Sequence, residues 1–222
     1  MPRAVIFANG HIGKIEPARN LLRAEDTIIA ADGGTRHVLS LGLVPSIIIG
    51  DLDSLTDTDQ KRAVTGGCEV IQHSRDKNET DLELALRFAT ESGYREILVV
   101  GALGGRLDQI LGNLSLLTGP GFADLDIYVD DGTEAAWFVR KEQEINGAPG
   151  DTVSLLPWGV DVTGVMTKGL RWPLRDESLF PDKTRGVSNE LVGMTGFVSI
   201  KSGLLLVILR RNQKNITAGR IP

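Results

Sequence analysis

The sequence predicts an α/β domain with a doubly wound, mostly parallel sheet, followed by an all-β antiparallel sandwich domain. Up to about residue 130, short apolar runs alternate with helical patterns, which is typical of alternating β and α units. These runs are continuous rather than alternating, as in strands that are covered on both faces. After about residue 131 the helical periodicity fades, and short strand patterns recur between Gly, Pro and Asn turns. We therefore predict domains at residues 1–133 and 134–222.

Runs rich in branched residues are expected to form the strands of the first domain. They lie at residues 5–8, 28–31, 47–49, 69–71, 97–100 and 125–129. A helix is predicted from Thr80 to Ser92, because Thr80 and Glu83 fit a capping box and apolar residues follow at helical spacing. A second helix is predicted from Arg106 to Leu117. Its expected apolar stripe consists of Leu107, Ile110, Leu111, Leu114 and Leu117.

The second domain shows short strand candidates. They lie at residues 136–139, 152–156, 197–201 and 204–209. The last two are separated by a short segment that contains a glycine, which predicts a hairpin. Residues 211–222 carry no such pattern and are expected to fray.

The composition excludes several classes of protein. A net charge of −5 argues against a nucleic-acid binder, which normally carries a basic stripe. The single cysteine, Cys68, excludes a disulfide framework and a Cys-based zinc site, and it is expected to be a small buried or loop residue and not a nucleophile. There is no run of about 18 apolar residues, so no membrane span is predicted, and the cytoplasm is the expected location.

Aspartates follow several of the predicted strands. Asp32 ends the second, Asp51 and Asp53 end the third, and Asp81 begins the helix after the fourth. The carboxyl ends of parallel strands meet at one edge of a sheet, so these carboxylates are expected to converge. Converging carboxylates repel one another unless a cation lies among them, and oxygen ligands suit Mg²⁺. The pattern indicates Mg²⁺-dependent phosphate chemistry.

Each of these motifs, taken alone, has a structural alternative. Asp51 and Asp53 point the same way if extended, but an Asp-rich turn explains them equally well. Asp32 and Gly33 fit a close approach of the backbone to a ligand, and also fit a tight strand-to-helix turn. Asp81 lies in a first helical turn, where the macrodipole stabilises a carboxylate without any metal.

The loop before the second helix is more specific. It joins an apolar strand to a helix through Gly104 and Gly105, which leaves backbone N–H groups free to face an anion. Arg106 adds a charge-assisted contact to a phosphate, and Gln109 and Asn113 share its polar helix face. The loop is neither a P-loop nor a dinucleotide-binding fingerprint.

In the second domain, Trp172 and the stretch Ser188-Asn189-Glu190 stand out. A tryptophan beside a proline in a β-rich region is most often a core or interface residue. A flat cationic ligand could also stack on it through cation–π attraction.

Together these motifs resemble those of the thiamine pyrophosphokinase family. The resemblance covers nearly the whole chain, and its motifs occur in order. They are A-D-G-G, P-S-I-I-I-G-D-L-D-S, N-E-T-D-L-E-L-A-L, G-A-L-G-G-R-L-D-Q-I-L-G-N-L, G-L-R-W-P-L and S-N-E. The resemblance implies an α/β nucleotide-binding domain followed by a β-sandwich domain for thiamine binding and dimerisation. It also implies a homodimer whose active site is shared between subunits, with thiamine and ATP as ligands and no membrane partner.

The resemblance also implies roles for individual residues. Asp32, Asp51, Asp53 and Asp81 match the residues that hold Mg²⁺ and the phosphates, and the last three, with Arg106, are the candidate catalytic residues. The nucleotide side of the cleft is expected to consist of Asp32, Gly33, Gly104, Gly105, Arg106, Asp108, Gln109 and Asn113. Trp172 matches the tryptophan that packs on the pyrimidine of thiamine, with Ser188 and Asn189 near the same pocket.

Two positions depart from the family pattern. Gln109 stands where histidine is common, and Leu84 stands where lysine is common. Gln cannot carry a proton near neutral pH, and Leu84 removes a positive charge from a phosphate-rich site.

The implied reaction is attack of the thiamine hydroxyl on the β-phosphorus of ATP, with AMP leaving and Asp51 or Asp81 accepting the proton. Two alternatives remain open: a diphosphokinase for another heteroaromatic alcohol, such as a pterin, and a nucleotide- or thiamine-binding sensor with weakened catalysis.

Overall fold

The structure is a computed structural model that describes residues 3–13 and 15–217. It divides into two compact units, the first ending at Asp131 and the second beginning at Gly132. The boundary predicted from the sequence, between residues 133 and 134, lies two residues further along the chain.

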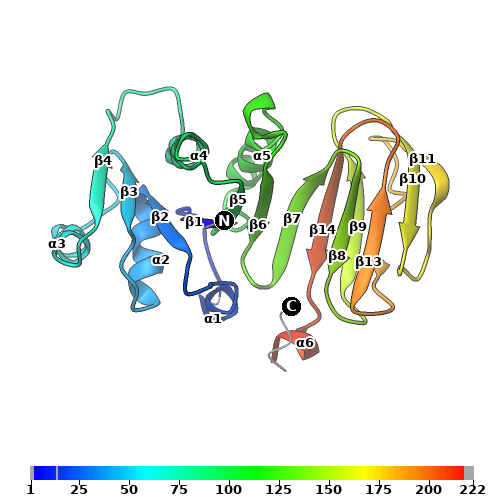
Figure 1. The fold of residues 1–222 in the computed structure, drawn as a ribbon, viewed down its shortest axis with the longest axis horizontal. Coiled ribbons are helices and arrows are strands. Elements are labelled where there is room, and N and C mark those ends of the chain that lie inside the picture. The colour runs from blue at the N-terminus through cyan, green and yellow to red at the C-terminus, as the bar shows by residue number, and fades with distance from the viewer. Residues whose placement is uncertain (1–2, 14, 218–222) are drawn as a thin grey trace. The chain divides into compact units, whose positions relative to one another are not determined.

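The first unit is built on a parallel sheet (Figure 1). Among the described residues its strands have the order β4–β3–β2–β1–β5–β6, and each neighbouring pair is parallel. They are β1 (Ala4–Phe7), β2 (Thr27–Ala31), β3 (Ile47–Gly50), β4 (Glu69–Gln72), β5 (Glu96–Val100) and β6 (Asp126–Asp130). Each lies within one residue of its prediction at either end, and the predicted fold class is confirmed.

Helices cover both faces of this sheet. They are α1 (Ile15–Arg19), α2 (Thr35–Ser40), α3 (Asp57–Thr65), α4 (Asp81–Glu91) and α5 (Leu107–Leu116), with 3₁₀ turns at Asp32–Gly34 and Pro120–Phe122. Figure 1 shows α1, α2 and α3 on one side of the sheet and α4 and α5 on the other. Right-handed crossovers require this change of side, because the strand order proceeds in one direction from β1 to β4 and in the other from β5 to β6.

The two predicted helices form, with one correction. Thr80 is the N-cap of α4, and its hydroxyl accepts a hydrogen bond from the Glu83 N–H at 3.2 Å. In α5 the expected apolar stripe is only half buried. Leu114 and Leu117 belong to the core, whereas the side chains of Leu107 and Leu111 are exposed. Only the second half of α5 therefore packs as the periodicity predicts.

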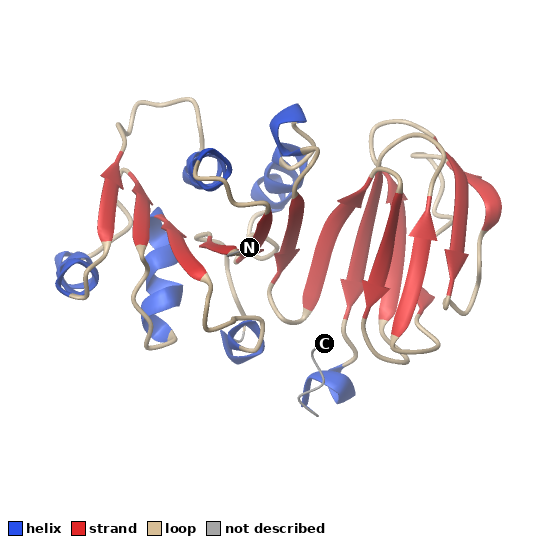
Figure 2. Cartoon of the chain, viewed as in Figure 1, coloured by secondary structure: helices blue, strands red, loops and turns tan. Residues whose placement is uncertain are grey.

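The second unit contains two antiparallel sheets (Figure 2). Their strand orders are β12–β9–β14–β7 and β11–β10–β13–β8. The strands are β7 (Glu134–Val139), β8 (Glu142–Asn146), β9 (Thr152–Pro157), β10 (Val162–Lys168), β11 (Arg175–Leu179), β12 (Asn189–Glu190), β13 (Thr195–Ser199) and β14 (Leu205–Arg210). The four predicted strands are present, and the sequence analysis did not identify β8, β10, β11 or β12.

The predicted hairpin near the carboxyl end of the chain is wrong. β13 pairs with β8 and β10, whereas β14 pairs with β7 and β9. The segment between them therefore passes from one sheet to the other, and each strand gains two partners in its own sheet instead of one in a hairpin. The fraying expected for residues 211–222 is also wrong in part, because α6 covers Gln213–Thr217. Residues 218–222 lie outside the described part of the chain.

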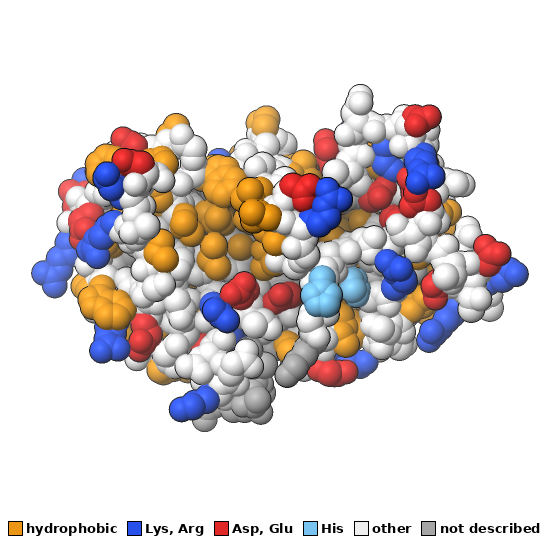
Figure 3. Space-filling model, turned by 180° about the vertical axis from the view of Figure 1, so that it is seen from behind, with side chains coloured by type: hydrophobic (Ala, Val, Ile, Leu, Met, Phe, Trp, Pro, Cys, Tyr) orange, Lys and Arg blue, Asp and Glu red, His pale blue; other side chains and the backbone are white. Residues whose placement is uncertain are grey.

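The surface of the described residues carries mixed charges. Acidic and basic side chains are interspersed on the face shown in Figure 3. Within the described ranges, no helix is both long enough and apolar enough to cross a membrane.

Cys68 is buried at the edge of the α/β core, as expected. Burial raises the pKa of its thiol to about 11, so the thiolate is scarce at about pH 8. We expect a thiol reagent to modify Cys68 in the native protein far more slowly than it modifies free cysteine. After denaturation, Cys68 should react as fast as free cysteine. A colorimetric thiol titration with and without guanidinium measures both rates. Rapid stoichiometric labelling of the folded protein would show that the Cys68 thiol is accessible and not buried.

Candidate functional site

A cavity of about 450 Å³ lies at the carboxyl ends of the parallel strands in the first unit. The strand order reverses between β1 and β5, and such a reversal opens a crevice between the loops that leave the sheet on either side. Loops that follow β1, β2, β3 and β5 line the cavity. Its polar lining consists of Asn9, Gly10, His11, Asp32, Asp53, Ser54, Thr80, Asp81, Gly104, Gly105, Arg106, Gln109 and Asn113.

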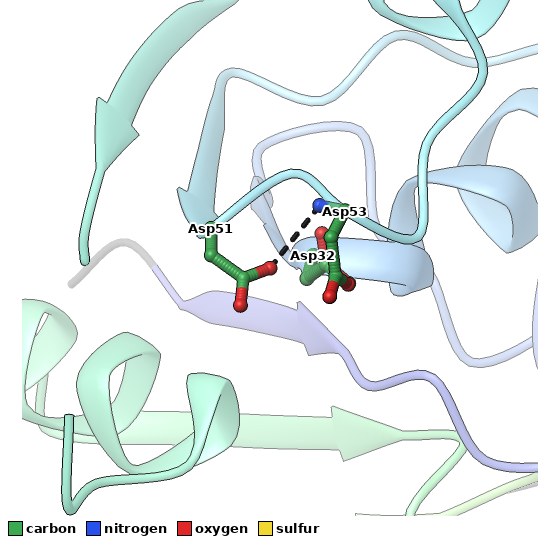
Figure 4. A group of neighbouring side chains, drawn as sticks. All are labelled: Asp32, Asp51 and Asp53. Carbon is green, nitrogen blue, oxygen red and sulfur yellow. Dashed lines mark hydrogen bonds between the residues drawn. The ribbon is translucent and has the colours of Figure 1, made fainter. Parts of the chain in front are cut away.

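Three aspartates converge beside this cavity. One carboxylate oxygen from each of Asp32, Asp51 and Asp53 lies within 4.8 Å of the others (Figure 4). Asp32 follows β2 and is buried, whereas Asp51 and Asp53 follow β3 and are progressively more exposed. The predicted convergence of carboxylates from neighbouring strands therefore occurs for these three.

The loop that carries Asp51 and Asp53 is turned rather than extended. Leu52 has a φ of 66°, and the Asp53 N–H donates to Asp51 Oδ1 at 3.1 Å. Asp32 also has a positive φ, 42°. Such conformations cost free energy in residues other than glycine and concentrate at functional sites. The loop is therefore the Asp-rich turn that the sequence allowed as an alternative, and this turn still brings both carboxylates close to Asp32.

The three carboxylates fit a hard divalent cation. Oδ1 of Asp32 is buried and has no hydrogen-bond partner among the described residues. A buried oxygen without a partner is costly, and a cation with oxygen ligands would satisfy it. Oxygen-only ligation favours Mg²⁺ over zinc.

Asp81 lies beside this group and has a partner of its own. Lys77 Nζ lies 2.7 Å from Asp81 Oδ1. Burial raises the pKa of Asp81, with contributions from Asp32 and Asp51, while Lys77 opposes the rise. A Cβ placed on Gly50 would lie 2.8 Å from Asp32 Cβ and 3.1 Å from Asp81 Oδ1. Glycine at the end of β3 therefore lets the two carboxylates approach each other.

A second basic residue reaches the group from the same loop as Lys77. Arg75 Nη2 lies 2.9 Å from Asp53 Oδ2. Sequence reasoning did not select Arg75 or Lys77, because neither belongs to a motif. Their positive charges offset part of the repulsion among the carboxylates.

The glycine–arginine loop forms the opposite wall of the cavity. Arg106 is the residue before α5, and its guanidinium pairs with Asp108 through two hydrogen bonds of 3.1 and 2.5 Å. This guanidinium lowers the pKa of Asp108. Gln109 and Asn113 follow on the same helix and line the cavity, and Asn113 Nδ2 donates to Ala102 O at 3.2 Å. The predicted polar face of α5 therefore faces the cavity.

The loop after β1 completes the wall and was missed by sequence reasoning. The Gly10 N–H donates to Gly101 O at 2.9 Å, and the His11 N–H donates to Gly104 O at 3.2 Å. Asn9 and His11 also line the cavity. Only their place in the sequence could have indicated Asn9 and His11. They follow the first parallel strand, as Asp32 follows the second.

Gly104 has no room for a side chain. A Cβ there would lie 1.8 Å from the backbone oxygen of His11. We expect Gly104→Ala to displace the loop after β1, to lower the free energy of unfolding by about 1–3 kcal/mol and to weaken nucleotide binding. Thermal unfolding and nucleotide titration measure these effects.

The matched control is Gly112→Ala in the exposed middle of α5, where a Cβ would meet nothing within 4 Å. This change should stabilise the helix by up to about 1 kcal/mol. Equal behaviour of the two variants would contradict the packing argument.

The two departures from the family pattern differ in position. Gln109 lines the cavity, as expected for its place in the motif. Leu84 is buried in α4 and does not line the cavity. The effect of Leu84 on the charge of the site stays a prediction.

Trp172 and the segment 188–190, which is hydrogen-bonded to it, form a surface of the second unit that we call the platform. Half of the surface of Trp172 is accessible, so the core alternative is excluded. The side-chain amide of the buried Asn189 holds the backbone of Trp172 and Glu190 in place. Asn189 Nδ2 donates to Trp172 O at 2.6 Å, and Asn189 Oδ1 accepts from Trp172 N–H at 3.1 Å and from Glu190 N–H at 2.9 Å. Ser188 is exposed, and its N–H donates to Ser154 Oγ at 3.1 Å.

Comparison with known proteins agrees with this arrangement. The profile of the thiamin pyrophosphokinase catalytic domain matches residues 18–129, and that of the thiamin pyrophosphokinase vitamin B1 binding domain matches residues 139–205. Thiamine pyrophosphokinase of Bacillus subtilis is 30% identical over 182 residues, which cover 81% of this chain and 85% of that protein. Thiamine pyrophosphokinase 1 of Oryza sativa subsp. japonica is 30% identical, over 94% of this chain and 88% of that protein.

Solved structures show the same similarity. The crystal structure of the Bacillus subtilis thiamine pyrophosphokinase superposes with a TM-score of 0.85 and 27% identity, over 96% of this chain and 100% of that one. The Geobacillus thermodenitrificans thiamin pyrophosphokinase gives a TM-score of 0.83 and 26% identity, over 96% and 99% of the two chains. With both family profiles matched and relatives at 30% identity over most of its length, the chain belongs to the thiamin pyrophosphokinase family.

Proposed function

We propose that this chain transfers the terminal diphosphate of Mg·ATP to the hydroxyethyl oxygen of thiamine, giving thiamine diphosphate and AMP. The observation that carries the proposal is the convergence of Asp32, Asp51 and Asp53 beside the cavity, which Asp32 and Asp53 line, in a chain that belongs to this family. The relatives named above are thiamine pyrophosphokinases, which favours thiamine over a pterin or another heteroaromatic alcohol and favours an enzyme over a sensor.

The first unit supplies the nucleotide side of the proposed site. Asp32, Asp51 and Asp53 would hold Mg²⁺, and Asp81, which is paired with Lys77, would contribute a fourth carboxylate to the same centre. When bound, Mg²⁺ neutralises charge on the phosphate oxygens and holds the diphosphate in place. Arg106 is exposed at the rim of the cavity, where its guanidinium can leave Asp108 for a phosphate.

Other cavity residues contact the rest of the nucleotide. Gly104 and Gly105 present backbone N–H groups at the start of α5, and Gln109 and Asn113 offer hydrogen bonds from its polar face. Gly33, also expected on the nucleotide side, lies in the buried 3₁₀ turn with Asp32 and does not line the cavity.

In the reaction, the thiamine hydroxyl oxygen forms a bond to the β-phosphorus of ATP. The bond from this phosphorus to the oxygen bridging the α-phosphate breaks, and the electron pair leaves with AMP. Asp51 or Asp81 accepts the hydroxyl proton. Positioning and charge neutralisation provide most of the catalysis in such transfers.

The second unit supplies the acceptor side. The exposed indole of Trp172 offers a flat surface for the pyrimidine of thiamine, and Ser188 lies on a neighbouring exposed segment. The amide of Asn189 is already bonded to the backbone of Trp172 and Glu190, so Asn189 positions the platform.

The identity of the acceptor is tested with a panel of alcohols. The purified protein is incubated with Mg·ATP and either thiamine, a hydroxymethylpterin or no acceptor, and the nucleotide products are separated by chromatography. We expect AMP to appear with thiamine alone. AMP with the pterin alone would show the alternative acceptor, and binding of thiamine with no turnover would show a sensor.

We also propose that the enzyme is a homodimer whose active sites are shared between subunits. If each site combines the first unit of one subunit with the second unit of its partner, two variants that are each nearly inactive at thiamine concentrations well below the wild-type KM can complement each other. Under that condition, mixing equal amounts of Asp51→Asn and Trp172→Ala protein, with subunit exchange, should restore about one quarter of wild-type activity, since half of the dimers carry one intact site. A mixture that stays as inactive as its components after exchange would contradict a shared site.

A further inference from the structure

The guanidinium of Arg171 lies on the platform proposed for the acceptor. Its Cζ is 5.0 Å from the centre of the Trp172 ring, and its Nη1 is 3.3 Å from Glu190 Oε2. Both charged side chains are more than one-third exposed, at 58% for Arg171 and 38% for Glu190. The proposed reaction assigns no role to this arrangement.

Arg171 engages the two groups of the platform that attract a cation. An aromatic face and a carboxylate each stabilise a nearby positive charge. Thiamine has a flat, neutral pyrimidine, which is proposed to stack on Trp172, and a cationic thiazolium ring joined to it through one carbon. The guanidinium of Arg171 is flat and cationic, and it contacts the Trp172 ring and the Glu190 carboxylate at once. This side chain therefore occupies both the ring face proposed for the pyrimidine and the carboxylate that would attract the thiazolium.

The side chain of Arg171 can move without disturbing the platform. The Arg171 N–H donates to Glu190 O at 2.9 Å, and the Asn189 amide holds the backbone of Trp172. These bonds involve backbone atoms of Arg171, Trp172 and Glu190. Within the described part of the chain, the exposed guanidinium, by contrast, contacts only the Trp172 ring face and the Glu190 carboxylate.

We propose that Arg171 is a stand-in cation, a side chain that occupies the Trp172 ring face and the Glu190 carboxylate until thiamine displaces it, with the pyrimidine on the ring and the thiazolium near the carboxylate. The inference rests on the proposed function, because it takes the Trp172 platform as the thiamine site. Displacement costs the contacts of Arg171, so this residue lowers affinity for thiamine. It also selects against neutral ligands, which displace the guanidinium but gain nothing from Glu190.

The test compares thiamine binding to the full-length protein and its variants without ATP, by calorimetry and by tryptophan fluorescence. We expect Arg171→Gln to bind thiamine about two- to five-fold more tightly than wild type, the range expected for loss of an exposed cation–π contact. Arg171→Lys, which keeps the charge, should remain close to wild type. The matched control is Arg185→Gln, because Arg185 is an exposed arginine paired with Glu177 in the same unit, and it should leave affinity unchanged.

A second variant separates charge from packing. In Arg171→Gln/Glu190→Gln the gain in affinity for thiamine should disappear, because the freed carboxylate is gone. The neutral aminopyrimidine half of thiamine serves as a probe. Arg171→Gln should raise the affinity for this probe less than it raises the affinity for thiamine. If Arg171 had only a structural role, the substitution would change the affinity for both ligands by the same factor.

The outcomes also distinguish this inference from the proposed function. Unchanged or weaker thiamine binding by Arg171→Gln, with normal binding by wild type, would overturn the stand-in role alone. Absence of binding by both proteins would overturn the stand-in role and the proposed function together. Tighter binding that is lost in the double variant supports the inference.

Discussion

Asp51→Asn is expected to lower turnover by about 10²- to 10³-fold, the range found when one strong electrostatic contact to a transition state is removed. Asp51 contributes one of the three converging carboxylates, and the amide retains the shape of the side chain while removing its charge. The Asp53 N–H can still donate to the amide oxygen, so the turn should persist. Steady-state kinetics with saturating ATP, thiamine and Mg²⁺ measure the effect.

Stability distinguishes a loss of charge from a loss of structure. Removing one of three mutually repelling carboxylates should leave the melting temperature of the metal-free protein unchanged or higher. The control is Asp124→Asn, because Asp124 is an exposed aspartate of the same unit outside the cavity, and it should retain wild-type turnover. Wild-type turnover in Asp51→Asn would contradict the assignment of the carboxylate group.

Trp172→Ala is expected to raise the KM for thiamine by about 10- to 100-fold while leaving the KM for ATP unchanged, because stacking on an aromatic face contributes about 1–3 kcal/mol. Both bonds between residue 172 and Asn189 involve the backbone of residue 172, so the loop should keep its conformation. Trp172→Phe, which keeps an aromatic face, should recover part of the affinity.

The control for this change is another exposed aromatic residue of the second unit. Phe180 is 42% exposed and has no assigned role, so Phe180→Ala should leave both KM values at the wild-type level. If Trp172→Ala raised the KM for ATP as much as that for thiamine, the change would be a general loss of structure and not a loss of the platform.

The sequence predicted the parallel sheet and its site because both depend on local patterns. Branched apolar runs identified every strand of the first unit, and the end of each strand indicated where a functional side chain could lie. Asp32 and Asp51 were found in this way. The same reasoning could have found Asn9 and His11, which follow β1 but carry no charge pattern.

Features that depend on tertiary placement were not predictable. The pairs Arg75–Asp53 and Lys77–Asp81 arise from the path of the loop between β4 and α4, which no periodicity describes. Leu107 satisfies the apolar spacing of α5, yet the structure exposes it. In the second unit, β8 and β11 are rich in charged residues and lack a strong strand pattern, so the partners of β13 were missed and a hairpin was predicted instead.

The bond that is broken in ATP distinguishes diphosphate transfer from transfer of a single phosphate. Phosphorus NMR of the protein with ATP, thiamine and Mg²⁺ identifies every phosphorus-containing product in one mixture. We expect AMP and thiamine diphosphate in equal amounts, with no reaction when a chelator removes the metal. ADP and thiamine monophosphate, formed by attack at the γ-phosphorus, would rule out diphosphate transfer.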